Sequence, residues 1–169
     1  HECSATGCTA TSSSDKDGYA AHDFTTGVCV CGVANVITSI ELSGITAPVA
    51  GATPVNSATV DKIGAEVDEE NIFWVRYDAS TGRTSDTYDD GSFVYNTPFR
   101  EGEIYLLQIM IKPKTGYGFT ADTNILYGGT ELSAPDAANP TTSYGAIAPD
   151  YSMAMALINP NGASAPLTY

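Results

Sequence analysis

The densest apolar run in the sequence extends from Ile104 to Ile111. Its odd-numbered positions are all apolar, and Gln108 is the only polar residue among its even-numbered positions. A strand with two apolar faces is typical of the centre of a sheet that is covered on both sides. Gly102 ends the turn before the run, and Pro113 ends the run because proline cannot donate a ladder hydrogen bond. The pattern therefore predicts a central strand.

Shorter segments with a period of two lie on both sides of this run, and no segment has the period of 3.6 with caps that predicts a helix. The clearest is aromatic and β-branched and contains the only tryptophan, Trp74. The expected strands cover residues 36–42, 58–63, 71–77, 93–95, 104–111, 123–127, 130–132 and 151–158, with a hairpin at Gly128-Gly129. Short strands with frequent turns predict an all-β fold, an antiparallel two-sheet sandwich. Its expected core contains Trp74, Tyr105, Leu107, Ile109 and Ile111.

The first 32 residues differ from the rest. They hold all four cysteines and both histidines of the chain but few apolar residues, so a covalent or metal cross-link would be needed to order them. We therefore divide the chain into a small Cys-containing N-terminal segment, residues 1–32, and a β-sandwich, residues 33–169.

Two disulfides are the favoured interpretation of Cys3, Cys8, Cys29 and Cys31. Residues at positions i and i+2 of a strand point the same way, so Cys29 and Cys31 bond more easily to two other cysteines than to each other. The expected bridges join Cys3 and Cys8 to these two residues, with the connectivity left open. A zinc site is the alternative, but the usual Cys-x-x-Cys spacing is missing. Free or mixed thiols are the third possibility.

Charge narrows the range of partners. The chain carries a formal net charge of −13, which disfavours binding to nucleic acids and to anionic membrane surfaces. It has no apolar run of membrane-spanning length, so membrane insertion is not expected. Asp15-Lys-Asp-Gly resembles part of a calcium loop, but Phe24 stands where an EF-hand requires glutamate. The acidic groups Asp68-Glu69-Glu70 and Asp86, Asp89 and Asp90 are expected to be solvated loops, with weak cation sites as the alternative, so no metal or cofactor is predicted.

Catalysis has few candidate groups. Residues 33–169 contain no histidine and no cysteine, which excludes Ser-His and Cys-His pairs within the sandwich. No Gly-rich phosphate loop is present, and the spacing of the acidic residues neither indicates nor excludes a pair of catalytic carboxylates. The sequence therefore predicts a protein that is not an enzyme.

Several segments resemble an immunoglobulin-like module of surface proteins from Gram-positive gut bacteria. They are Ile40-Glu-Leu-Ser-Gly-Ile-Thr-Ala-Pro, the Trp74 strand, Phe99-Arg-Glu-Gly-Glu-Ile-Tyr and Thr115-Gly-Tyr-Gly-Phe. Tyr105 lies near the start of its strand, as in a tyrosine corner, with the spacing shifted by one. Residues 1–32 are loosely similar to short His/Cys/Gly segments beside such modules. The resemblance implies an extracellular, non-catalytic β-sandwich, secreted or attached to the cell surface through regions outside this fragment.

Two functions follow as hypotheses. The first is an adhesive or spacer unit of a larger cell-surface or secreted protein. The second is a carbohydrate- or peptide-binding module whose partner is a glycan or a host or bacterial surface protein. Exposed aromatic rings suit both kinds of ligand, and loops often carry such contacts. The candidate residues are the tyrosines near turns: Tyr88, Tyr95, Tyr127 and Tyr144.

Overall fold

The computed structural model describes residues 35–78, 80–133 and 143–161, and these ranges form β-strands with almost no helix. The prediction of an all-β fold is therefore confirmed. The strands are β1 (Asn35–Val36), β2 (Ser39–Ser43), β3 (Thr59–Val60), β4 (Ala65–Asp78), β5 (Arg83–Ser85), β6 (Ile104–Pro113), β7 (Tyr117–Gly118), β8 (Asn124–Tyr127), β9 (Thr130–Glu131), β10 (Tyr144–Ile147) and β11 (Ala154–Ile158). A single 3-10 turn, η1 (Val94–Asn96), lies between β5 and β6. The cysteines and histidines at the N-terminus lie outside the described residues.

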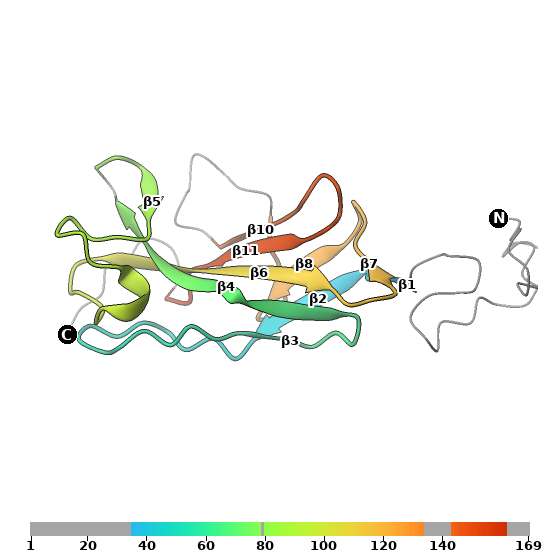
Figure 1. Ribbon diagram of the computed structural model, residues 1–169, viewed down its shortest axis with the longest axis horizontal. Coiled ribbons are helices and arrows are strands. Elements are labelled where there is room, and N and C mark those ends of the chain that lie inside the picture. Colours follow the sequence, from blue (N-terminus) through green and yellow to red (C-terminus); the bar gives the residue numbers. More distant parts are fainter. Residues whose placement is uncertain (1–34, 79, 134–142, 162–169) are drawn as a thin grey trace, which may run out of the picture.

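Two larger sheets make up the body (Figure 1). One has five strands in the order β10-β11-β6-β4-β5, and the other has four in the order β3-β2-β8-β9. A small third sheet pairs β1 with β7. The densest apolar run forms β6 in the middle of the five-stranded sheet, which confirms its predicted central position.

The main core lies where the two larger sheets contribute side chains to one cluster. Its members include Ile40 and Leu42 from β2, Ile125 from β8, and Trp74 and Ile109 from β4 and β6. All five predicted core residues are buried there. A smaller cluster of Val75, Leu106 and Leu157 packs with Phe73 and Tyr144. Residues of β6 that alternate along the strand enter different clusters, but Leu106 is the only β6 residue in the smaller one, and Ile104, Gln108 and Met110 beside it are partly buried. One face of β6 is therefore fully covered and the other in part.

The strand directions correct one part of the prediction. β2 pairs with β8 in parallel, and so does β1 with β7, whereas every pair within the five-stranded sheet is antiparallel. The expectation of a wholly antiparallel sandwich is therefore wrong. Alternation of apolar residues reveals which face a side chain takes but not the direction of the strand. The chain leaves β2, builds most of the other sheet and then returns to form β8, so no hairpin fixes their relative direction.

Several predicted strands have different boundaries or a different form. The segment at 36–42 is divided into β1 and β2, the segment at 58–63 contains only β3, and the segment at 151–158 begins later, as β11. The segment around Trp74 was expected to start at residue 71, but β4 starts at Ala65 and carries a bulge between Val67 and Ile72. The bulge takes up the polar residues 68–71 without ending the strand. The predicted strand at 93–95 is η1 instead, preceded by a single bridge between Thr87 and Phe93.

Hydrogen bonds from core aromatic residues hold two long connections in place. The Oη atom of Tyr105 accepts a hydrogen bond from the backbone N–H of Arg100 at 2.8 Å and lies 2.7 Å from the Oη atom of Tyr88. The Nε1 atom of Trp74 donates to the carbonyl of Val55 at 3.0 Å, which pins the connection between β2 and β3. Because their polar atoms are paired, these aromatic rings are buried without the cost of an unsatisfied donor or acceptor.

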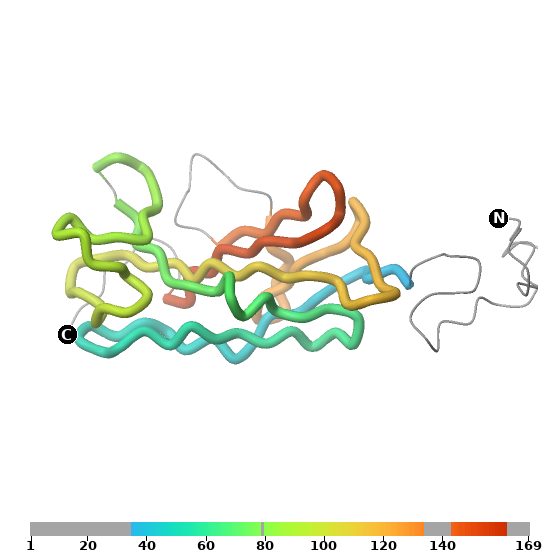
Figure 2. The backbone as a smooth tube through the Cα atoms, in the orientation of Figure 1, coloured from blue at the N-terminus to red at the C-terminus, as the bar shows by residue number. Residues whose placement is uncertain are grey.

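The body is longer in one direction than in the others, and the described chain begins and ends at different places along it (Figure 2). The first strand, β1, lies at one end of the long axis. The chain end after β11 (red) lies well toward the opposite end. The five-stranded sheet runs along this axis, with η1 far from β1 (Figure 1).

Candidate binding site

The structure separates the four candidate tyrosines. Tyr127 belongs to β8 and packs against the main core, whereas Tyr144 belongs to β10 and packs against the smaller cluster. Tyr95 lies in η1. Tyr88 is only 3% exposed, so the expectation of an exposed loop side chain is wrong for this residue. They do not form one site.

The position of Tyr88 has a clear physical cause. The residues after it, Asp89-Asp90-Gly91, form a polar turn, which is the signal that suggested an exposed loop. The ring of Tyr88 points inward instead, with its hydroxyl bonded to Tyr105 and the guanidinium of Arg100 3.6 Å from its ring centroid. Burial raises the pKa of Tyr88. This tyrosine fastens the turn to the core.

Tyr95 belongs to a partly exposed group of three aromatic side chains, which we call the aromatic ledge: Phe73, Phe93 and Tyr95. The rings of Phe93 and Tyr95 are stacked, with centroids 5.1 Å apart and an angle of 29° between the planes. Phe73 on β4 meets Tyr95 edge-on at 6.2 Å. Phe93 is 43% exposed, so one ring of the ledge faces solvent. An exposed aromatic face of this kind suits a sugar ring or an apolar side chain of a partner.

Sequence reasoning found Tyr95 but missed the two phenylalanines. The sequence predicted both phenylalanines as strand residues. The spacing of two between Phe93 and Tyr95 was the available signal, because residues i and i+2 of an extended segment lie on the same side. The contact with Phe73 depends on how η1 folds over β4, and no local pattern reports that contact.

A network of charged groups supports the segment that carries the ledge. Arg76 on β4 donates from its Nε atom to the carbonyl of Thr87 at 3.0 Å and forms ion pairs with Asp89 and Glu103. Arg100 pairs with Asp90 at 2.6 Å. These contacts fix the excursion between β5 and β6, so the ledge stands on a well-supported loop.

The carboxyl of Asp90 shows how tightly this turn is built. The hydroxyl and the backbone N–H of Ser92 both donate to its Oδ1 atom, at 2.6 and 3.0 Å. These two bonds, followed by the Arg100 guanidinium, hold the pKa of Asp90 well below its usual range. Asp78 makes the same kind of turn with Ser80, and its pKa falls to about 2. Both carboxylates act within the fold.

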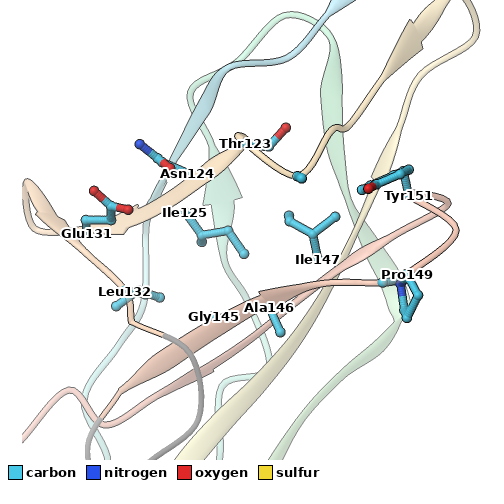
Figure 3. A pocket seen from close by; sticks show the side chains of 12 residues that line it. Thr123, Asn124, Ile125, Glu131, Leu132, Gly145, Ala146, Ile147, Pro149 and Tyr151 are labelled. Atoms are coloured by element: carbon cyan, nitrogen blue, oxygen red, sulfur yellow. The ribbon is translucent and has the colours of Figure 1, made fainter.

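A second candidate site is a groove of about 470 Å³ between the edges of the two larger sheets (Figure 3). We call it the edge groove. Its apolar surface comes from Ile125 on β8, Leu132 after β9 and Ile147 on β10, whose side chains point into the same space. Asn124 and Glu131 line the side formed by the four-stranded sheet. The opposite end is closed by Pro149 and Tyr151 in the turn from β10 to β11.

Two details mark the walls of the edge groove. Thr123 is buried and structural: its Oγ1 atom donates to the carbonyl of Ile37 at 2.6 Å and accepts from the N–H of Thr120 at 2.9 Å.

Tyr151 has a φ of +59°, the left-handed region that a bulky side chain rarely adopts. Its backbone N–H donates to the carbonyl of Ala148, and its side chain is 44% exposed. Backbone outliers of this kind often occur at functional sites.

Within the described ranges, no group of three or more His, Cys, Asp or Glu side chains is placed to hold a metal ion. Asp68 at the β4 bulge lies 3.7 Å from Lys112, and its pKa is lowered chiefly by the hydrogen bond from Asn71.

The described residues contain no helix with the length and apolar character needed to cross a membrane. The predicted disulfide residues Cys3, Cys8, Cys29 and Cys31 lie outside the described residues, so their pairing stays a prediction.

Comparison of the chain with protein-family models, with curated proteins and with solved structures finds no match.

Proposed function

We propose that this chain is a non-catalytic, immunoglobulin-like module of a larger extracellular or cell-surface protein, where it acts as an adhesive or spacer unit. The tyrosine-corner bond carries the immunoglobulin-like part of the proposal. The hydroxyl of Tyr105, near the start of β6, accepts the N–H of Arg100 five residues upstream. The tyrosine corner of immunoglobulin-like folds makes a bond of this kind. The buried Trp74 between the two sheets is a second point in favour.

The non-catalytic part is supported by the position of the titratable groups with shifted pKa values. In active sites, burial and neighbouring charges shift the pKa values of catalytic side chains that line a cleft. Among the described residues, the shifted groups Tyr88, Asp90, Arg100 and Tyr105 are engaged with each other or with Ser92 in the fold. Asp78 and Asp150 each accept hydrogen bonds from a serine two residues further on, and Asp68 accepts one from Asn71. None of the shifted groups is among the described residues that line the edge groove. Asp68 lines a separate groove beside β3 and β4, where the amide of Asn71 and the ammonium of Lys112 pair with it.

The elongated body supports the spacer role. A module that receives the chain at one end and passes it on toward the other extends a surface protein in one direction. β1 and the end of β11 have such an arrangement (Figure 2). The two sheets and the pinned connections give the rigidity that a spacer needs.

A carbohydrate-binding function is the second candidate, and the stacked, partly exposed Phe93 and Tyr95 favour it. Rings that already stack on each other lose little conformational freedom when a sugar packs on the exposed face. The net charge of −13 favours neutral glycans over acidic ones.

The test is an array screen with the chain made multivalent on a tetrameric carrier. The array holds neutral glycans, acidic glycans, and host and bacterial surface proteins, and each spot is analysed by mass spectrometry after incubation. We expect unmodified ligands at every spot, with any binding confined to neutral glycans or proteins. Chemical conversion of a ligand that disappears when one acidic residue is changed would refute the proposal.

The double variant Phe93→Ala with Tyr95→Ala tests the ledge, and Val36→Ala, at another half-exposed apolar position, is its matched control. If the ledge binds a glycan, the double variant should lose about tenfold or more in affinity while the control stays unchanged. Equal glycan binding by both variants would remove the carbohydrate-binding candidate. If no spot retains the wild-type chain, the spacer role remains and the adhesive role does not.

A further inference from the structure

The free edge of β10 has an alternating hydrogen-bond pattern that can be worked out from its pairing with β11. Ala148 donates its N–H to the carbonyl of Met153, so these two residues form a hydrogen-bonded pair. Antiparallel ladders alternate such pairs with pairs that exchange no hydrogen bonds. In the observed register, Gly145 and Ile147 therefore occupy the second kind of pair, with Ala156 and Ala154. Their backbone N–H and C=O groups point away from β11.

The chain itself already uses one of these outward groups. The N–H of Gly145 donates to the carbonyl of Ser133 at 3.0 Å, and the N–H of Leu132 donates to the carbonyl of Ile125 at 2.8 Å. The short segment after β9 thus bridges the edges of both sheets at one end of the edge groove. Ile147 lies further along the same edge, where its side chain lines the groove. No hydrogen bond from its outward N–H to the rest of the described chain is found.

We propose that the edge groove binds an extended, cationic peptide segment, which adds to β10 as a further strand. The outward N–H and C=O of Ile147 pair with the backbone of the peptide, as main-chain bonds do in strand addition. Every second side chain of the peptide packs on Ile125, Leu132 and Ile147. The volume of about 470 Å³ falls within the range of sites that hold small ligands and peptide side chains.

Charge determines which peptide fits. Glu131 lines the groove, and Asp122 and Asp150 are each next in sequence to a lining residue. The described lining residues include no lysine and no arginine. A peptide whose other side chains are basic is therefore attracted, whereas an acidic peptide is repelled. The net charge of −13 likewise disfavours a second copy of this chain as the occupant.

Tyr151 supports a binding role for the groove. Its left-handed backbone conformation suits glycine better, yet a large aromatic side chain stands there and forms part of the wall. A strained residue that contributes a ring to a groove is consistent with selection for contact rather than for stability.

The test titrates the full chain with a blocked peptide of alternating valine and lysine and follows backbone amide signals by NMR. A peptide of alternating valine and glutamate tests charge, and the lysine peptide N-methylated at alternate residues tests backbone pairing. We expect the lysine peptide to bind and to shift the amide signal of Ile147 most. Both other peptides should bind much more weakly. No binding at millimolar peptide, or equal binding of the N-methylated peptide, would overturn the proposal.

Variants of Ile147 separate backbone pairing from side-chain packing. Ile147→Pro removes the outward N–H without removing a bond to β11, at an edge position where proline is tolerated in a sheet, and it also replaces the isoleucine side chain. Ile147→Ala is its control because it shortens the side chain but keeps the N–H. Ile147→Pro should bind the lysine peptide at least about fivefold more weakly than Ile147→Ala does, since it lacks one backbone bond. Equal affinities would contradict strand addition, provided that both variants keep the wild-type circular-dichroism spectrum.

The strained turn provides an independent check. Tyr151→Gly relieves the left-handed strain and removes the ring from the groove. We expect an unchanged or higher thermal midpoint together with weaker peptide binding. Undiminished peptide affinity in this variant would show that the turn is no part of the site. A self-association of the wild-type chain that blocks the lysine peptide would identify a second copy as the occupant and overturn the proposal.

Discussion

Removing the hydroxyl of Tyr105 is the most informative single change to the fold. The variant Tyr105→Phe keeps the ring, which packs against Phe99 with centroids 4.7 Å apart, so the apolar contacts are preserved. The lost oxygen leaves two polar groups without their partner. They are the backbone N–H of Arg100, which is 2.8 Å away, and the hydroxyl of Tyr88, which is 2.7 Å away.

The expected cost follows from the burial of these groups. A buried donor or acceptor left without a partner costs about 1–3 kcal/mol. The Tyr88 hydroxyl is buried and the Arg100 amide is partly buried, so together we expect a loss of about 2–4 kcal/mol in the free energy of unfolding. For a chain of this length, that loss corresponds to a thermal midpoint lower by about 5–15 °C.

Urea unfolding followed by circular dichroism measures this change. Tyr88→Phe is the matched control, because it removes the hydrogen bond between the hydroxyls but leaves the acceptor for Arg100 in place. We expect it to cost about 1 kcal/mol. The double variant should cost less than the sum of the two single variants, since the bond they share is removed only once.

One result would refute the reasoning: a Tyr105→Phe variant within about 0.5 kcal/mol of the wild type, the size of an ordinary surface substitution. The connection between η1 and β6 would then be held by packing alone. The tyrosine-corner bond would lose its role as support for the immunoglobulin-like proposal.

Three further predictions concern the core, the alkaline limit of stability and the N-terminal segment. Ile109→Ala, at a fully buried position of β6, should cost about 2–5 kcal/mol in urea unfolding, whereas Ile63→Ala, at an 84% exposed position, should change little. Burial and the bond to Tyr88 raise the pKa of Tyr105, so the folded state keeps its phenolic proton longer than the unfolded state does. The contribution of Tyr105 to the free energy of unfolding should therefore be constant below about pH 10 and decrease above it, and Tyr105→Phe should reduce that decrease. A free energy of unfolding that stays constant above about pH 10 would contradict the raised pKa of Tyr105. The four cysteines of residues 1–32 should form two bridges between Cys3 or Cys8 and Cys29 or Cys31. Mass spectrometry of non-reduced peptides would contradict this by finding four free thiols or a retained zinc ion.

The apolar pattern predicted the strands that bury most of their side chains. The run at Ile104–Ile111 and the segment around Trp74 appear as β6 and β4, because two-faced burial leaves a direct trace in the sequence. The bulge in β4 was not predictable from alternation, since its polar residues look like a loop. The parallel pairing of β2 with β8 was not predictable either, because pairing between distant segments depends on the path of the chain.

The candidate sites were predicted less well than the fold. A turn signal beside Tyr88 suggested exposure, but the hydroxyl of Tyr105 provides a buried partner from a distant strand. Tyr95 was found, whereas its contact with Phe73 depends on the tertiary fold. The edge groove combines residues from β8, β10 and the turn after β10, and none of these segments carries a binding motif of its own.

The most direct test of the proposed function is the array screen of the multivalent chain with mass analysis of every spot. A non-catalytic adhesive module should retain neutral glycans or surface proteins and leave their masses unchanged. Retention of glycans should also be reduced when Phe93 and Tyr95 are both replaced by alanine. The contradicting result is a ligand whose mass changes on contact with the wild-type chain and no longer changes when one acidic residue is replaced.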